Sequence, residues 1–157
     1  MDRTWDGKPI SPDPPFGVAV VIYRRGDDGP EVLLLHRAHH GPDYAGDWAW
    51  TPPAGARLPG ESIEACIQRE LLEEVGLSIQ VTRTEHGPPE WPYYRAEVDP
   101  SVAIVLGDDE HDRYEWVSLS EATRRCLPAV VAEAIRMVGD EIFGELARAP
   151  DAALRRR

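Results

Sequence analysis

The segment from Ser62 to Gly76 restricts the fold more than any other part of the chain. Its apolar residues recur at helical spacing, and Gly76 follows them where many helices end in a left-handed residue. Three glutamates, Glu70, Glu73 and Glu74, stand at i, i+3 and i+4 and therefore share one face of the predicted helix. Like charges so placed destabilise an isolated helix, so the rest of the domain has to hold this acidic face and offset its charge.

The other sides of this helix carry apolar residues, which are Ala65, Ile67, Leu71, Leu72 and Val75. The helix is therefore expected to pack against the domain on more than one side. Arg69 lies within reach of Glu61 and Glu73, and pairing with either residue would orient the carboxylates. Hard divalent cations with oxygen ligands offset such a charge cluster well, and the glycine-containing loop before the helix allows backbone carbonyls to approach the same ion. The segment predicts a cation-binding face.

Patterns typical of strands lie on both sides of this helix. Residues 16–24 and 31–37 are rich in Val, Ile and Leu, and the turn signal at 26–30 between them predicts a β-hairpin. Further strands are expected over residues 77–84, 93–98, 101–106 and 114–117. The chain thus alternates strands with a central helix.

Two helices are expected toward the end of the chain. Ser118 and Glu121 match the capping-box pattern that opens a helix, and Pro128 starts a last helix with one apolar face. This order of elements predicts a single α+β domain over residues 1–157, with the Pro- and Asp-rich residues 1–15 as an irregular arm.

Composition excludes several classes of partner. The net charge is −11, which argues against nucleic acid or an anionic membrane as the main partner. No apolar run is long enough to span a bilayer, and the first fifteen residues lack the apolar core of a secretory signal. Cys66 and Cys126 are too few for a disulfide scaffold and are expected to be buried thiols in a reducing cytoplasm.

Taken as one pattern, Gly55–Leu77 resembles the Nudix box, which runs Gly, five residues, Glu, seven residues, Arg-Glu, apolar, any, Glu-Glu, any, Gly, apolar. Every defined position is met, by Gly55, Glu61, Arg69, Glu70, Leu71, Glu73, Glu74, Gly76 and Leu77. A solvated glutamate face explains an isolated Glu-x-x-Glu-Glu, but a chance match to the full pattern arises on the order of once in 10⁷ chains of this length. One departure is Ala54, where many members have a second glycine, and it predicts at most a subtle change of loop geometry.

The resemblance implies a Nudix-like α/β/α sandwich with a central mixed sheet, in which the box forms a loop, a helix and a loop. It implies hydrolysis of a phosphoanhydride bond in a nucleoside-diphosphate-linked substrate, with Mg²⁺ or Mn²⁺ as cofactor. The ligands that it implies are Glu70, Glu73, Glu74, Glu110 and the Gly55 carbonyl, with Arg69 and Glu61 in support. Glu110 is chosen for its spacing to the strand of Trp116, and a solvated loop acid is the alternative interpretation of it. The general base stays open between Glu70 and Glu110.

The substrate is less well defined by the sequence. Aromatic residues that can stack on a base are Trp48, Trp50, Trp91, Tyr93 and Tyr94, and arginines that can contact phosphates are Arg37, Arg57 and Arg95. Each of them is more often a core or surface residue than a ligand-binding one. Tyr94 lies 17 residues beyond Leu77, a spacing similar to that of dinucleoside-polyphosphate hydrolases, whereas Pro92, at 15, is similar to the ADP-ribose-directed subgroup.

Several functions therefore stay open. A nucleoside triphosphate or a dinucleoside polyphosphate is the favoured substrate, and a small-molecule nucleotide is the expected partner of a cytoplasmic monomer or homodimer. An ADP-ribose or nucleotide-sugar pyrophosphatase is the alternative. A non-catalytic nucleotide-sensing module usually has eroded box carboxylates, whereas this box is intact. Isopentenyl-diphosphate isomerase needs a cysteine in the pocket, and Cys66, inside the helix, fits that role poorly.

Overall fold

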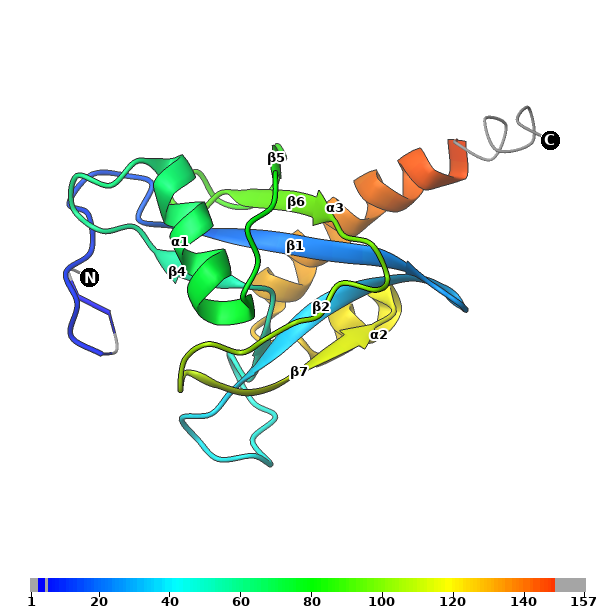
Figure 1. The fold of residues 1–157 in the computed structure, drawn as a ribbon, viewed down its shortest axis with the longest axis horizontal. Helices are drawn as coiled ribbons and strands as arrows, with labels where there is room; N and C mark the ends of the chain where they lie inside the picture. Colours follow the sequence, from blue (N-terminus) through cyan, green and yellow to red (C-terminus); the bar gives the residue numbers. More distant parts are fainter. Residues whose placement is uncertain (1–2, 5, 149–157) are drawn as a thin grey trace.

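A seven-stranded mixed sheet with helices on both of its faces forms the framework of the computed structural model, which describes residues 3–4 and 6–148 (Figure 1). The strands are β1 (Gly17–Gly26), β2 (Gly29–Arg37), β3 (Trp50–Thr51), β4 (Ala54–Ala56), β5 (Thr82–Arg83), β6 (Tyr93–Glu97) and β7 (His111–Val117). The helices are α1 (Ile63–Val75), α2 (Leu119–Arg125) and α3 (Ala129–Arg148). The order β3-β2-β1-β6-β5 is extended by β4 on β1 and by β7 on β2, and only the pairing of β1 with β6 is parallel. The α+β sandwich expected from the sequence is confirmed.

Helix α1 begins and ends where the sequence predicts. The Ser62 hydroxyl accepts a hydrogen bond from the Ala65 N–H at 3.1 Å, which satisfies one of the free donors of the first turn. At the other end Gly76 adopts a left-handed conformation with φ of 71°, and its N–H donates to the carbonyls of the last turn. These two caps fix the length of the helix and therefore the direction in which its glutamates point.

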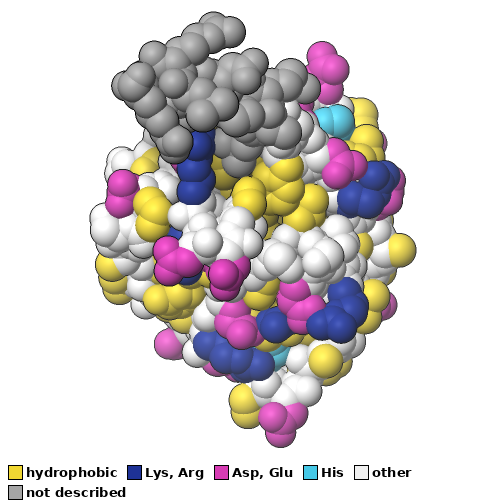
Figure 2. Space-filling model, turned by 90° about the vertical axis from the view of Figure 1, so that its right-hand side faces the viewer, with side chains coloured by type: hydrophobic (Ala, Val, Ile, Leu, Met, Phe, Trp, Pro, Cys, Tyr) yellow, Lys and Arg dark blue, Asp and Glu magenta, His cyan; other side chains and the backbone are white. Residues whose placement is uncertain are grey.

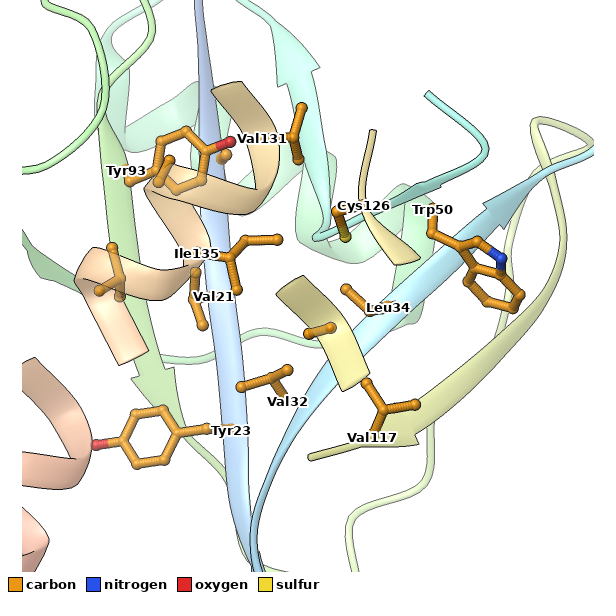
Figure 3. Packing of buried hydrophobic residues seen from close by; sticks show 14 of the residues in the cluster. Val21, Tyr23, Val32, Leu34, Trp50, Tyr93, Val117, Cys126, Val131 and Ile135 are labelled. Carbon is orange, nitrogen blue, oxygen red and sulfur yellow. The ribbon is translucent and has the colours of Figure 1, made fainter. Parts of the chain in front are cut away.

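Alternating residues of β1 supply the two hydrophobic cores of the molecule. Val20 and its even-numbered neighbours pack toward α1, against residues such as Leu71. Val21 and its odd-numbered neighbours pack toward α2 and α3, where Ile135 meets the sheet (Figure 3). The period of two along a strand thus gives the sheet two buried faces. None of the helices that the structure describes could span a bilayer.

Each core also holds one of the two cysteines. Cys66 lies in the core on the α1 side, and Cys126, at the end of α2, lies in the core on the α3 side. Both side chains are fully buried, and burial raises the pKa of each thiol to about 12. The expectation of buried thiols is confirmed.

The segment after α1 differs from the sequence prediction. Residues 77–84 form a strand only at Thr82–Arg83, and residues 101–106 form no strand. The chain there runs along the end of α1, where the Val105 N–H donates to the Val75 carbonyl at 3.0 Å. A Cβ at Gly107 would lie 2.4 Å from the Glu73 carbonyl oxygen, so this loop touches the helix directly. The apolar residues that resemble a strand instead cover the helix end.

The last strand and helices follow the prediction more closely. Strand β7 begins at His111 rather than residue 114, because it pairs along β2 from Val32 to Arg37 through an irregularity at His36/Arg37. The Ser118 hydroxyl caps α2 by accepting from the Glu121 N–H at 3.2 Å, while the Glu121 carboxylate pairs with arginines of α2 rather than closing the capping box.

On the face of the molecule shown in Figure 2, acidic and basic side chains lie intermingled rather than gathered by sign.

Candidate active site

The acidic face of α1 lines a cleft of about 1170 Å³. Ten candidate functional residues predicted from the sequence line this cleft, which are Arg37, Trp48, Gly55, Arg69, Glu70, Glu73, Glu74, Trp91, Tyr93 and Glu110. They come from β2, the loop before β3, β4, α1, the start of β6 with the loop before it, and the loop before β7. The fold therefore brings the predicted ligands on α1 together with Glu110, which is remote from them in sequence.

Gly55 makes room for the Glu70 carboxylate. A Cβ built at Gly55 would lie 1.9 Å from the carboxyl carbon of Glu70, a separation that no side chain can tolerate. The neighbouring Ala54 meets no such limit, since it pairs with Ala19 in the sheet and its N–H donates to Glu74 Oε1 at 2.9 Å. The box glycine is thus required by close packing of strand β4 against the carboxylate face of α1.

Glu74 is the most deeply buried acid of the cleft. Its side chain is 1% exposed, and burial raises its pKa well above the usual range, with a further rise from the charges of Glu70 and Glu110. Burial likewise raises the pKa of Glu70 to about 7, against the lowering effect of Arg69. Two desolvated carboxylates side by side are costly unless a cation shares them.

Arg69 orients the acids rather than facing the cleft as a free cation. Its guanidinium donates to both oxygens of Glu61, at 2.7 and 2.9 Å, and to Glu70 Oε1 at 2.8 Å. A further hydrogen bond reaches the Ala56 carbonyl at 3.0 Å, and Glu73 lies 3.4 Å away. The pairing with Glu61 predicted from the sequence is confirmed, and it lowers the pKa of Glu61. Arg69 therefore ties the loop before α1 to the helix.

His111, which is not among the residues predicted from the sequence, lies against the same acids. Its side chain is 2% exposed, and Nδ1 lies 3.6 Å from Glu74 Oε2 without a hydrogen-bond partner in the described part of the chain. Burial, aided by the charge of Arg37, lowers its pKa to about 4, so the imidazole is neutral at pH 7. The sequence feature that could have identified His111 is its position directly after Glu110, where the acidic loop enters β7.

These residues fit a divalent cation. Within the described residues, Glu74, Glu110 and His111 each offer one ligand atom, and the three atoms lie within 4.8 Å of one another. Carboxylate oxygens and a neutral imidazole are common metal ligands, and the unpartnered Nδ1 of His111 is a buried polar atom that a ligand would satisfy. A cation here would also offset the charge of Glu70 and Glu74.

Four of the eight candidate substrate residues line the cleft, which are Arg37, Trp48, Trp91 and Tyr93. Arg37 lines the cleft with Nη2 3.8 Å from Glu110 Oε1 and with a buried Nε that has no hydrogen-bond partner among the described residues. Trp48 lines it with 47% of its surface exposed and with a positive φ of 65°, which is unusual for a bulky residue. Arg57 and Tyr94 do not line the cleft. Arg57 donates to main-chain carbonyls, and Tyr94 is buried in the core on the α1 side.

The end of the cleft away from the glutamates of α1 is largely apolar, and its α3 side is not among the features predicted from the sequence. Its apolar side chains are Trp48, Trp91, Tyr93 of β6, and Val130, Val131, Ala134 and Met137 of α3. Three polar side chains, Glu85, His86 and Glu133, also line the cleft. Trp91 lies so close to β1 that a Cβ at Gly17 would be 2.3 Å from its ring. Val130 and Met137 are 57% and 37% exposed, although both are apolar. The cleft therefore joins an acidic end to an apolar end.

Comparison with known proteins decides the family. The family description named NUDIX domain matches residues 14–138, which include every element from β1 to α2 and half of α3. The chain belongs to the Nudix family. An NAD-capped RNA hydrolase, NudC, of Deinococcus radiodurans is 28% identical over 138 residues, which cover 78% of this chain and 47% of that protein. This Nudix chain thus spans about half the length of that relative.

Two further proteins resemble this Nudix chain over most of their own length. An asymmetrical bis(5'-nucleosyl)-tetraphosphatase of Sus scrofa is 32% identical over 120 residues, which cover 66% of this chain and 78% of that protein. The solved structure of a C. elegans Ap4A hydrolase binary complex superimposes with a TM-score of 0.65 at 25% identity. That match covers 82% of this chain and 97% of the other, so most of the fold is shared.

Proposed function

We propose that the protein hydrolyses a phosphoanhydride bond in a nucleoside-diphosphate-linked substrate with Mg²⁺ or Mn²⁺ as cofactor. The observation that carries this proposal is the buried cluster of Glu74, Glu110 and His111 at one end of a cleft whose other end is apolar. A cluster of that kind fits a cation and the phosphates that it binds, whereas the apolar end fits a base. Membership of the Nudix family supports the same reaction class.

The residues that would hold the ion are Glu70, Glu73, Glu74, Glu110, His111 and the Gly55 carbonyl. An ion held there neutralises phosphate charge and lowers the pKa of a bound water. Glu74 is fixed for this task by the Ala54 N–H, and Glu70 is fixed by Arg69. The carboxylates of Glu70 and Glu110 are the two candidates to accept a proton from the attacking water.

Arg37 would contact the phosphates directly. Its buried Nε has no hydrogen-bond partner among the described residues, and its guanidinium lies beside Glu110 at the rim of the acidic cluster. An Arg fork suits phosphate oxygens because it donates two parallel hydrogen bonds. Of the predicted arginines, Arg37 is therefore the phosphate-binding candidate of the proposed site, whereas the Arg57 guanidinium donates to main-chain carbonyls of residues before β1.

The apolar end supports a nucleoside as the other half of the substrate. Trp48 and Trp91 offer indole rings, and α3 offers an aliphatic wall that includes Met137. Base stacking on aromatic side chains contributes roughly 1–3 kcal/mol per base. A nucleoside triphosphate or a dinucleoside polyphosphate is the favoured substrate. NAD resembles a dinucleoside polyphosphate in that two nucleosides are joined through phosphates. The activities named for NudC and for the tetraphosphatase therefore both agree with this chemistry.

A substrate panel tests the proposal. It contains NTPs, dNTPs, oxidised dNTPs, ADP-ribose, NADH, nucleotide sugars and diadenosine polyphosphates, with products separated by chromatography. We expect turnover that requires Mg²⁺ or Mn²⁺. Preference for ADP-ribose or a nucleotide sugar would select the alternative pyrophosphatase class, and metal binding without turnover of any compound would contradict the enzymatic proposal in favour of a sensing module.

The matched variants are Glu74→Gln and Glu64→Gln. Both change one glutamate of α1, but Glu74 is buried in the cluster whereas Glu64 is exposed in the first turn. Glu74→Gln should lower kcat by about 10³-fold or more because it removes a ligand charge from the reacting centre. Glu64→Gln should leave kcat unchanged. An active Glu74→Gln enzyme would refute the assignment of the metal site.

A further inference from the structure

The chain before β1 lies on the cleft, far in sequence from the box that lines its acidic end. Arg3, Thr4, Asp6, Lys8 and Ile10 belong to this arm, defined as the described residues 3–4 and 6–16, and all five line the cleft. Ile10 and Ser11 are 7% and 3% exposed, so the base of the arm is buried against the domain. The arm thus forms part of the cleft wall.

Arg57 holds the arm in place. Its guanidinium donates to the carbonyls of Pro15 at 2.8 Å and Asp13 at 2.6 Å, both in the arm, and to the carbonyl of Glu61 at 2.7 Å. The Ser11 N–H in turn donates to the Arg57 carbonyl at 2.7 Å. Because Arg57 directly follows β4, these hydrogen bonds attach the arm to the end of the strand whose Gly55 packs on Glu70.

The tip of the arm is a closed loop with its own hydrogen bonds. The Thr4 N–H donates to the Lys8 carbonyl at 2.8 Å, and the Lys8 N–H donates to the Thr4 hydroxyl at 2.9 Å. Arg3 Nη1 donates to the Gly7 carbonyl at 2.9 Å, and Arg3 forms a bridge with Pro9. These hydrogen bonds hold Arg3 and Lys8 close to one another at the tip.

Charge at the cleft is strongly unbalanced. Nine acidic residues line it among the described residues, against four cations, which are Arg3, Lys8, Arg37 and Arg69. Arg69 is committed to Glu61 and Glu70. Lys8, the single lysine of the sequence, is 58% exposed, and its ammonium lies 3.7 Å from Asp6. Lys8 lines the same cleft as Asp108 and Asp109 of the acidic loop before β7.

We propose that the arm is part of the substrate site, and that Lys8, assisted by Arg3, binds non-bridging oxygens of the phosphate chain opposite the acidic face of α1. This inference rests on the proposed function. The phosphate chain would then lie between cations on the arm and the ion held by the glutamates, with Arg37 at the rim. A lysine suits this position because its ammonium is a compact charge on a flexible stem, which can leave Asp6 for a phosphate oxygen.

Steady-state kinetics with three variants test the role of Lys8. Lys8→Gln should raise KM about tenfold at low salt and leave kcat nearly unchanged, because a charge-assisted hydrogen bond to bound substrate is lost. The increase should shrink at high salt, and Lys8→Arg should restore most of the affinity. Arg25→Gln is the control, since Arg25 is similarly exposed, at 60%, and pairs with Glu97 outside the cleft. An unchanged KM in Lys8→Gln would overturn the proposal.

Chemical labelling provides a readout that needs no turnover. Lys8 carries the only side-chain amine of the sequence, so an N-hydroxysuccinimide ester acetylates Lys8 and the terminal amine. Trypsin cleavage after Arg3 places these two amines on different peptides, so the acetylation of Lys8 can be measured separately. Inorganic tripolyphosphate with Mg²⁺ should slow acetylation of Lys8 several-fold and leave the terminal amine unaffected. Turnover without such protection would overturn the role of the arm while leaving the proposed function intact. Protection without turnover of any nucleotide would support the arm and contradict the enzymatic proposal.

Discussion

The acidic end of the cleft and its apolar end differ in how the chain builds them. The acidic end takes most of its residues from one continuous segment, Gly55–Leu77, whose carboxylates are held by Arg69 and by the close packing of β4 on α1. The apolar end combines Trp48, Trp91 and one face of α3, which are far apart in sequence, and several of these side chains are exposed. A motif can therefore specify the reacting centre locally, whereas the part of the cleft that selects the substrate depends on tertiary contacts.

Gly55→Val should produce the largest effect, because it breaks the packing on which the acidic end depends. The new side chain would begin 1.9 Å from the carboxyl carbon of Glu70 and displace that carboxylate. We expect activity to fall by about 10³-fold and stability by roughly 1–3 kcal/mol, measured by metal-dependent turnover and thermal unfolding. Ala54→Gly, one residue away, is the control: it keeps the N–H that holds Glu74 and should leave activity unchanged, at a cost in stability of at most ~1 kcal/mol. Full activity in Gly55→Val would show that Glu70 has no fixed position.

His111→Gln should produce the next largest effect and tests whether the acidic end extends beyond the box. Loss of the imidazole beside Glu74 should weaken Mn²⁺ binding by about 10- to 100-fold, measured by electron paramagnetic resonance of the free ion. The exposed His40→Gln is the matched control and should bind Mn²⁺ like the unaltered protein. Equal Mn²⁺ affinity in both variants would limit the site to carboxylates.

Trp48→Gly should affect the apolar end alone. The positive φ of 65° suits glycine better than tryptophan, so the unfolding free energy should stay the same or rise by up to ~1 kcal/mol. The KM for a nucleotide should nevertheless rise about tenfold, because a stacking surface is lost. Kinetics and denaturant unfolding of the same variant separate the two effects. An unchanged KM would exclude Trp48 from substrate binding.

The smallest effect concerns the two cores that support both ends. Burial raises the pKa of Cys66 and of Cys126 to about 12, above the ordinary value of 9.0. Because these pKa values are higher in the folded state than in the unfolded state, the protonated thiols contribute to the free energy of unfolding below pH 9. That contribution is lost as the pH rises from 9 toward 12. At pH 8 both thiols should therefore react with a disulfide reagent far more slowly in the folded protein than in denaturant. A rapid reaction of either thiol would show that its core opens locally.

Much of the acidic end follows from the sequence because its interactions are short in range. Glu70, Glu73 and Glu74 share a face through helix geometry, and the caps at Ser62 and Gly76 are local hydrogen bonds. Residues 101–106 resemble a strand by their apolar pattern, yet they cover the end of α1, since pattern alone does not say what a segment packs against.

The sequence by itself determined the helix, its acidic face and the family, because each depends on spacing within one segment. It also placed Arg69 within reach of Glu61 and Glu73, and the structure shows that Glu61 is the main partner. Only the tertiary structure decided that His111 joins the cluster, that Arg57 clamps the arm and that Tyr94 lies in the core away from the cleft. Those outcomes depend on which strands pair and on which face of the sheet each residue occupies. A shift of one residue in a strand reverses the face, and distant segments fix that choice.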